Sequence, residues 1–140
     1  MNLYIKKTWV NKRDDCKKHQ IKTLKKNISD MKAGSLMLIP STRIIDNYIR
    51  GLSKGSYVDF KTMRKNLSKI FNCDVTCPLT SGIFLRIVSE AAYEEFKLGK
   101  NINKITPFWR CVNPDSKLAF KLSFGIDFLI SQQFSENITF

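Results

Sequence analysis

The sequence lacks the segments that would place it in a membrane or send it out of the cell. No apolar run approaches the ~20 residues that a membrane-spanning helix needs, and the chain is 43% hydrophobic overall. The start of the chain has only a three-residue apolar group at 3–5 before two lysines, which is too short for the apolar region of a signal peptide. We therefore expect a cytoplasmic protein with no membrane segment.

Metal ligands are also scarce. The chain has one histidine, His19, and four cysteines, which are Cys16, Cys73, Cys77 and Cys111. Three residues separate Cys73 from Cys77, but the histidine is far away in sequence, so the signal for a zinc site is weak. In a reducing compartment thiols do not pair. We predict loop and core thiols, with no metal and no cofactor.

Acidic residues are half as frequent as basic ones. The chain has 12 Asp and Glu against 24 Lys and Arg, which gives a formal net charge of +12 at pH 7. An excess of this size attracts polyanions through the summed field of the surface. Nucleic acid is therefore the first expected partner, and an anionic membrane surface is the second. A length of 140 residues is typical of one domain with its own hydrophobic core.

The chain is predicted to have a basic N-terminal extension at residues 1–34 and a folded domain at 35–140. The extension has poor periodicity and many lysines, so it is either a flexible arm that adds phosphate contacts or a segment docked by a few apolar side chains. Trp9, Ile21 and Leu24 are the candidate anchors. We favour partial docking, because a tryptophan usually buries its large ring.

The first half of the domain predicts one strand and two helices. The apolar run at 36–39 is typical of a buried strand. An amphipathic helix at 42–50 follows Ser41, and a second at 59–71 begins at Asp59; Ser and Asp side chains both cap helix amides well. The second helix has a basic face, which is solvated or in contact with phosphates.

A third helix is predicted from 80 to 98, capped by Thr80 or Ser81 and ended by Gly99 in the left-handed conformation. A helix N-terminus attracts anions through its dipole and its free amide groups. The hydroxyls of the first turn would add to this, and Gly82 removes a side chain where a ligand could approach closely.

Two extended runs, 105–112 and 117–122, flank the turn-forming sequence Asn-Pro-Asp-Ser and predict a β-hairpin. A short packing helix at 125–134 would follow. Helices followed by a hairpin are the order of elements in a winged helix. The predicted fold class is therefore α+β, a winged helix-turn-helix with a helical core and a small hairpin wing.

The segment from Pro107 to Val112, its downstream turn and the helix led by Gly125 give the domain a family resemblance. Over about residues 36–140 the chain resembles the C-terminal DNA-binding domain of the alkylguanine-DNA alkyltransferases and, more closely, the alkyltransferase-like proteins. In the transferases the corresponding segment reads Pro-Cys-His-Arg-Val, and its cysteine accepts the alkyl group.

The resemblance implies a DNA-binding protein without enzymatic activity. Phe108 stands at the position of the nucleophile and Trp109 at that of the activating histidine, so the thiolate chemistry has neither part. Alkyltransferase-like proteins also lack the cysteine, and they bind DNA with an alkylated guanine flipped out and pass the lesion to other repair factors. By this resemblance Phe60 falls near a family tyrosine, and Ser81 or Gly82 falls near the arginine that fills the gap left by the flipped base.

Two sets of site residues follow from the basic faces and the resemblance. The predicted DNA contacts are Phe60, Lys61, Arg64, Thr80, Ser81, Gly82, Arg86 and Arg110. The predicted lesion pocket consists of Phe108, Trp109 and Arg110, because extrahelical bases are held by stacking and by hydrogen bonds to their edges. Packing of Phe108 and Trp109 in the core is the alternative.

The predicted function is non-enzymatic binding of double-stranded DNA by a monomer, with sensing of alkylated bases and contacts to other repair proteins. One alternative is a general winged-helix DNA-binding or regulatory protein. A second is an enzyme in which Cys111 or Cys77 is the nucleophile. A third is a protein-interaction module in which a partner binds either an acidic face of Glu90, Glu94 and Glu95 or the N-terminal segment.

Overall fold

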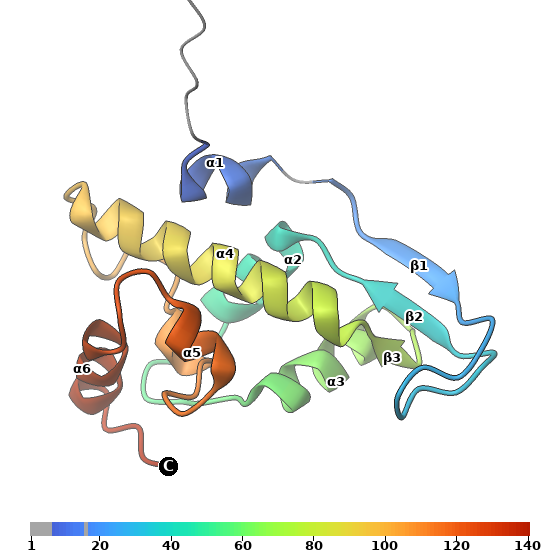
Figure 1. Cartoon of the computed structure of the whole chain (residues 1–140). Helices are drawn as coiled ribbons and strands as arrows, with labels where there is room; N and C mark the ends of the chain where they lie inside the picture. The colour runs from blue at the N-terminus through green and yellow to red at the C-terminus, as the bar shows by residue number, and fades with distance from the viewer. Residues whose placement is uncertain (1–6, 16) are drawn as a thin grey trace, which may run out of the picture.

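Helix α4 (Pro78–Lys97) runs through the middle of the molecule, and the other elements are arranged around it (Figure 1). The computed structural model describes residues 7–15 and 17–140. Residues 1–6 and 16, which include Cys16 and the beginning of the predicted basic extension, lie outside the described residues. The described chain has helices and a small three-stranded sheet, which confirms the α+β class.

The sheet lies at the N-terminal end of α4 (Figure 1). Strand β1 (Gln20–Thr23) pairs antiparallel with β2 (Leu36–Ile39), and β2 pairs in parallel with the short β3 (Val75–Thr76). Leu38 in β2 is fully buried, so the strand predicted at 36–39 is confirmed. Its neighbour β1 belongs to the predicted N-terminal extension, and the two parts of the chain therefore share one sheet.

The two amphipathic helices form where they were predicted. Helix α2 (Thr42–Arg50) is capped by the hydroxyl of Ser41, which accepts from the Ile44 amide. Helix α3 (Phe60–Ile70) is capped by the Asp59 carboxylate, 2.7 Å from the Thr62 amide nitrogen. Both helices turn their apolar stripes into the core, through Ile45, Ile49, Met63 and Leu67.

Helix α4 begins earlier than predicted. Its N-cap is Cys77 and its first residue is Pro78, because proline lacks the amide hydrogen that would be left unpaired there and its fixed φ suits the first helical position. The predicted cap at Thr80 or Ser81 is therefore wrong. The predicted end is confirmed, since Gly99 has a φ of +102°.

The predicted hairpin at 105–122 is wrong. Residues Phe108–Arg110 form a 3-10 helix, η1, and Lys117–Lys121 form helix α5. A strand alternates its side chains between two faces, but Phe108 and Trp109 are consecutive and both buried. Ser116 accepts a hydrogen bond from the Ala119 amide, so it begins a helix instead of closing a turn between strands.

The terminal helix α6 (Asp127–Ser135) agrees with the packing helix predicted at 125–134. Gln133 on its buried face donates to the carbonyls of Trp109 at 3.0 Å and Val112 at 2.7 Å, so α6 closes over η1. The core between these elements and α4 is rich in aromatic rings, including Phe108, Trp109, Phe124 and Phe128.

The N-terminal helix α1 (Trp9–Asp14) packs against the C-terminal half of α4 (Figure 1). The Glu94 carboxylate accepts from the backbone amides of Trp9 and Val10, at 3.2 and 3.1 Å. Arg13 forms an ion pair with Glu95. The attachment is mainly polar, since α1 has no fully buried residue.

Partial docking of the N-terminal segment is confirmed for two of its three candidate anchors. Trp9 is half-buried beside α4 and Leu24 is buried, whereas Ile21 is 47% exposed. Over residues 7–15 and 17–140, no helix combines the length and the apolar character that crossing a membrane requires.

Candidate nucleic-acid interface

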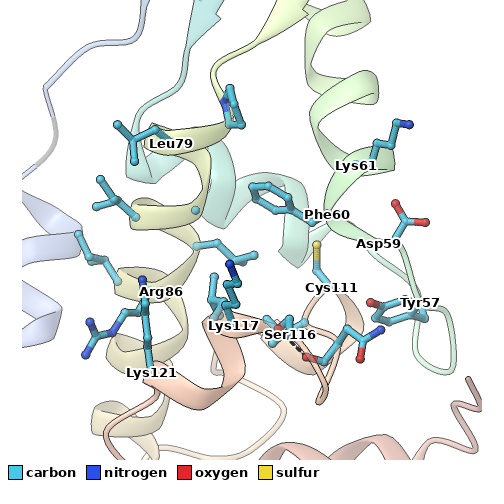
Figure 2. Close-up of a pocket in the computed structure, with 18 of the residues that line it drawn as sticks. Tyr57, Asp59, Phe60, Lys61, Leu79, Arg86, Cys111, Ser116, Lys117 and Lys121 are labelled. Atoms are coloured by element: carbon cyan, nitrogen blue, oxygen red, sulfur yellow. Dashed lines mark hydrogen bonds between the residues drawn. The ribbon is translucent and has the colours of Figure 1, made fainter. Parts of the chain in front are cut away.

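A groove of about 940 Å³ opens between the first half of α4, the start of α3 and the segment that leads into α5 (Figure 2). Trp9 and Lys12 of α1 form one edge. Much of its lining is apolar, and Leu79 and Ile83, one turn apart on α4, are 72% and 50% exposed. Apolar side chains this exposed beside a cavity are typical of a binding surface.

The lining of the groove also carries positive charge. Five basic side chains line the groove: Lys12, Lys61, Arg86, Lys117 and Lys121. Among the described residues that line the groove, the one carboxylate is Asp59. Hydrogen bonds from Thr62 hold the pKa of Asp59 below its usual range, so this carboxylate is ionised at neutral pH and occupied in capping α3.

Phe60 and Gly82 face each other across the groove. Figure 2 shows the Phe60 ring pointing from α3 toward α4, with the Cys111 sulfur near it. A Cβ atom on Gly82 would lie 3.9 Å from Phe60 Cζ, which is ordinary contact distance. Any side chain longer than alanine at position 82 would therefore enter the space beside the ring.

Arg86 is held between α1 and the core. Its guanidinium carbon lies 5.3 Å from the centre of the Trp9 ring, and its Nη2 lies 3.6 Å from a Glu90 oxygen. Glu90 is only 2% exposed and accepts from both the backbone amide and the hydroxyl of Ser123. The arginine that was predicted to contact DNA is thus fixed at the groove wall.

Three other predicted DNA contacts have internal partners. Arg64 donates from Nε and Nη2 to the Thr76 carbonyl, at 3.0 and 2.9 Å, and so ties α3 to β3. Ser81 is fully buried and its hydroxyl donates to the Cys77 carbonyl at 2.6 Å. The Thr80 hydroxyl contacts the Cys77 thiol at 3.3 Å. A phosphate contact by Ser81 is ruled out by its burial, because the earlier helix start places it one turn inside α4.

The predicted lesion pocket is filled in the structure. Phe108 is 0% and Trp109 2% exposed, and both rings belong to the core. Arg110 donates to Glu136 from Nε and Nη2, both at 2.9 Å, and to the Leu52 carbonyl from Nη1. Core packing, the alternative for the two rings, is therefore what the structure shows.

Glu136 is the buried acceptor that sequence reasoning missed. It also accepts from Trp109 Nε1 at 2.7 Å and from the Gly55 amide at 2.8 Å. Burial favours the protonated carboxyl, but the hydrogen bonds from Arg110, Gly55 and Trp109 outweigh burial and hold the pKa of Glu136 below its usual range. Nothing local signals this role, because Glu136 lies in a polar tail 26 residues from Arg110.

The three cysteines that the structure describes, Cys73, Cys77 and Cys111, are free thiols. Burial raises the pKa of Cys111 to about 12, and its thiol lies 3.6 Å from the Met63 sulfur, so it is a core thiol. Burial also raises the pKa of Cys73. Within residues 7–15 and 17–140, no three metal-ligating side chains come together.

The acidic face proposed for a protein partner is occupied from within. Glu90 accepts a hydrogen bond from Ser123 and forms an ion pair with Arg86. Glu94 accepts from the α1 backbone, and Glu95 forms ion pairs with Arg13 and Lys100. These carboxylates therefore stabilise the fold.

The groove contains four of the eight predicted DNA contacts, namely Phe60, Lys61, Gly82 and Arg86. The predicted DNA contacts did not include three lysines that line the groove, Lys12, Lys117 and Lys121. The two lysines of α5 had been assigned to a strand, and Lys12 to an extension outside the domain. Their spacing in sequence carries no signal that they meet in space.

No protein-family model, no curated protein and no solved structure matches this chain.

Proposed function

We propose that this protein binds double-stranded DNA without altering it chemically, and that the groove beside α4 is the contact surface. The observation that carries the proposal is the set of five basic side chains that line the groove with one occupied carboxylate. Lysines and arginines that neutralise phosphates supply most of the affinity of non-specific DNA binding. The net charge of +12 supports the same partner.

A winged-helix arrangement is part of the proposal. Helices α3 and α4 would form the helix-turn-helix pair, and the β1–β2 hairpin at the N-terminal end of α4 would be the wing (Figure 1). This hairpin comes before the helices in the chain, whereas the sequence predicted one after them.

Fluorescence anisotropy with a labelled 20-bp duplex at several salt concentrations tests this proposal. If all five cations contact phosphates, the slope of log K against log salt is about −4.5, and affinity falls about 500-fold between 50 and 200 mM salt. We expect a double variant, Lys117→Gln with Lys121→Gln, to reduce the slope by about 2.

The matched control is Lys97→Gln with Lys104→Gln, which removes the same charge from exposed positions outside the groove. It should change the slope far less than the α5 pair. Equal effects of the two double variants would show that the groove is not the site. No binding of duplex at 50 mM salt would overturn the proposal.

Sensing of alkylated bases is a second candidate, favoured by the resemblance to the alkyltransferase-like proteins. Because Phe108 and Trp109 are buried in the core, the groove would have to receive the base. A duplex carrying one O6-alkylguanine should then bind at least tenfold tighter than the same plain duplex. Equal affinities would leave general DNA binding alone.

A further inference from the structure

The groove has two chemically different parts, and a duplex can use only one of them. Its basic side chains suit phosphates and are called the basic rim here: Lys12, Lys61, Arg86, Lys117 and Lys121. Its apolar lining, called the apolar floor, includes Phe60, Leu79, Ile83 and Leu118. A duplex offers its phosphates and the mostly polar edges of its bases in the grooves, and the faces of its bases are covered by stacking on their neighbours. A duplex lying on the rim would leave the floor without a partner.

A single strand can satisfy both parts. Its unpaired bases offer bare π faces to aromatic and apolar side chains, while its phosphates meet the cations of the basic rim. The volume of about 940 Å³ is at the upper end of the range of about 300–1,000 Å³ for small-ligand sites. The groove is thus roomy enough for flat, apolar groups.

The Phe60 ring lies close to α4 at Gly82. Gly82 has no side chain at the point where α4 faces the Phe60 ring, and a longer side chain would occupy the space beside the ring. Phe60 is half-buried: it packs against the core, it lines the groove, and the Arg64 guanidinium carbon lies 5.9 Å from its ring centre. It is therefore a fixed surface on which a base could stack.

We propose that the groove binds an unpaired segment of single-stranded nucleic acid. The bases lie on Phe60 and the apolar floor, and the phosphates lie on the basic rim. This rests on the proposed function, because it assumes that the rim binds nucleic acid. The ligand preferred by the groove is then a single strand, and duplex binds through the rim alone.

The test compares a labelled 15-nucleotide oligo(dT) with a labelled 15-bp duplex at 100 mM salt. We expect the single strand to bind at least fivefold tighter. Phe60→Leu, which removes the ring but keeps an apolar side chain, should weaken single-strand binding about tenfold and duplex binding much less. Gly82→Met, which fills the space beside the ring, should act in the same direction.

The control is Phe134→Leu, which removes a ring that is 83% exposed on α6 and does not line the groove. Thermal melting checks that each variant is folded. Because Phe60→Leu and Gly82→Met alter the groove independently, the proposal can still be tested if one of them misfolds. Phe134→Leu should leave the ratio of single-strand to duplex affinity as it is in the original protein.

The outcomes separate the two proposals. Duplex binding that equals or exceeds single-strand binding overturns the single-strand proposal and leaves the proposed function standing. No binding of either nucleic acid overturns both. Stronger displacement of oligo(dT) by an acidic amphipathic peptide than by unlabelled oligo(dT) would show that the groove is a protein-docking site, and this too overturns the single-strand proposal.

Discussion

Loss of the Glu136 carboxylate should damage the fold severely, because several donors depend on it. It accepts four hydrogen bonds: one from the Gly55 amide, one from Trp109 Nε1 and two from the Arg110 guanidinium. Its side chain is 5% exposed and that of Arg110 is 14% exposed. The substitution Glu136→Ala would leave the largely buried Arg110 guanidinium, the buried Trp109 Nε1–H and the Gly55 amide without this acceptor.

The expected loss of stability is about 4 kcal/mol. Removing one member of a buried ion pair costs about 3–5 kcal/mol, because the remaining charge is left without compensation. Arg110 keeps its bond to the Leu52 carbonyl, which limits the damage. With a urea m-value of about 2 kcal/mol/M, the midpoint should fall by about 2 M at an unchanged m-value.

The pH dependence gives an independent check on the same carboxylate. The pKa of Glu136 is lowered in the folded state relative to its ordinary value of 4.5. Its contribution to stability is therefore fully present above the ordinary value and is lost as the pH falls below 4.5 and through the folded-state pKa. Glu136→Gln removes this part of the acid sensitivity while keeping the shape of the side chain.

The matched control is Asp115→Ala, which removes an exposed carboxylate and should change stability by no more than about 0.5 kcal/mol. A loss below about 1 kcal/mol for Glu136→Ala would refute the view that this carboxylate joins η1, α6 and the loop before α3. If Glu136→Gln loses as much stability at acid pH as the unsubstituted protein does, Glu136 is not the source of that loss.

Three further predictions follow from local contacts. Because its pKa is about 12, the thiol of Cys111 should not react with iodoacetamide at pH 8 in the folded protein, but it should react after denaturation. Intact-protein and peptide masses would show this. An adduct on Cys111 in the folded protein would contradict its burial. Gly82→Ala should raise the free energy of unfolding by about 1 kcal/mol and the melting temperature by about 3 °C. Alanine favours the helix, and its Cβ would lie 3.9 Å from its nearest neighbour, at ordinary contact distance. A lower melting temperature would show that the alanine side chain does not fit there. Glu94→Ala should speed hydrogen exchange of the Trp9 and Val10 amides at least fivefold with little effect in α3, and unchanged exchange would show that α1 is held by other contacts.

The sequence predicted helices whose start signals are local. Ser41 and Asp59 each stand immediately before an amphipathic stretch, and each caps the helix that follows. The segment 105–122 was mispredicted, because its conformation depends on partners far away. Phe108 and Trp109 are buried together by α6 and the C-terminal tail, and an alternating pattern around a turn cannot report this.

The groove was predictable only in part for the same reason. Phe60 and Gly82 were selected, but they lie 22 positions apart in sequence, and only the fold brings the Phe60 ring to Gly82. Lys12 reaches the groove through the docking of α1, which depends on Glu94 and Glu95 at the other end of α4. Sequence periodicity reports which face of a helix is buried, but it does not report which helices become neighbours.

The placement of the carboxylates explains why the net positive charge is available at the groove. Many of the acidic side chains are occupied by internal donors: Asp46 by Thr106 and Arg50, Asp59 by Thr62, Asp74 by Leu36, and Glu90, Glu94, Glu95 and Glu136 as described above. They stabilise helix ends and buried donors, and only Asp59 lines the groove.

The contributions of the basic rim and of the apolar floor to binding affinity should be separable by two different measurements. Exposed charges are screened beyond about 8 Å at physiological salt, so the basic rim would attract a nucleic acid mainly at contact. Its contribution should appear in the salt dependence of affinity. Stacking on Phe60 releases no counterions, so it should appear in the ratio of single-strand to duplex affinity and leave the salt slope unchanged. A Phe60 variant that alters the salt slope as much as the α5 lysine variant would mean that the ring acts by positioning the cations, and that the floor does not bind bases itself.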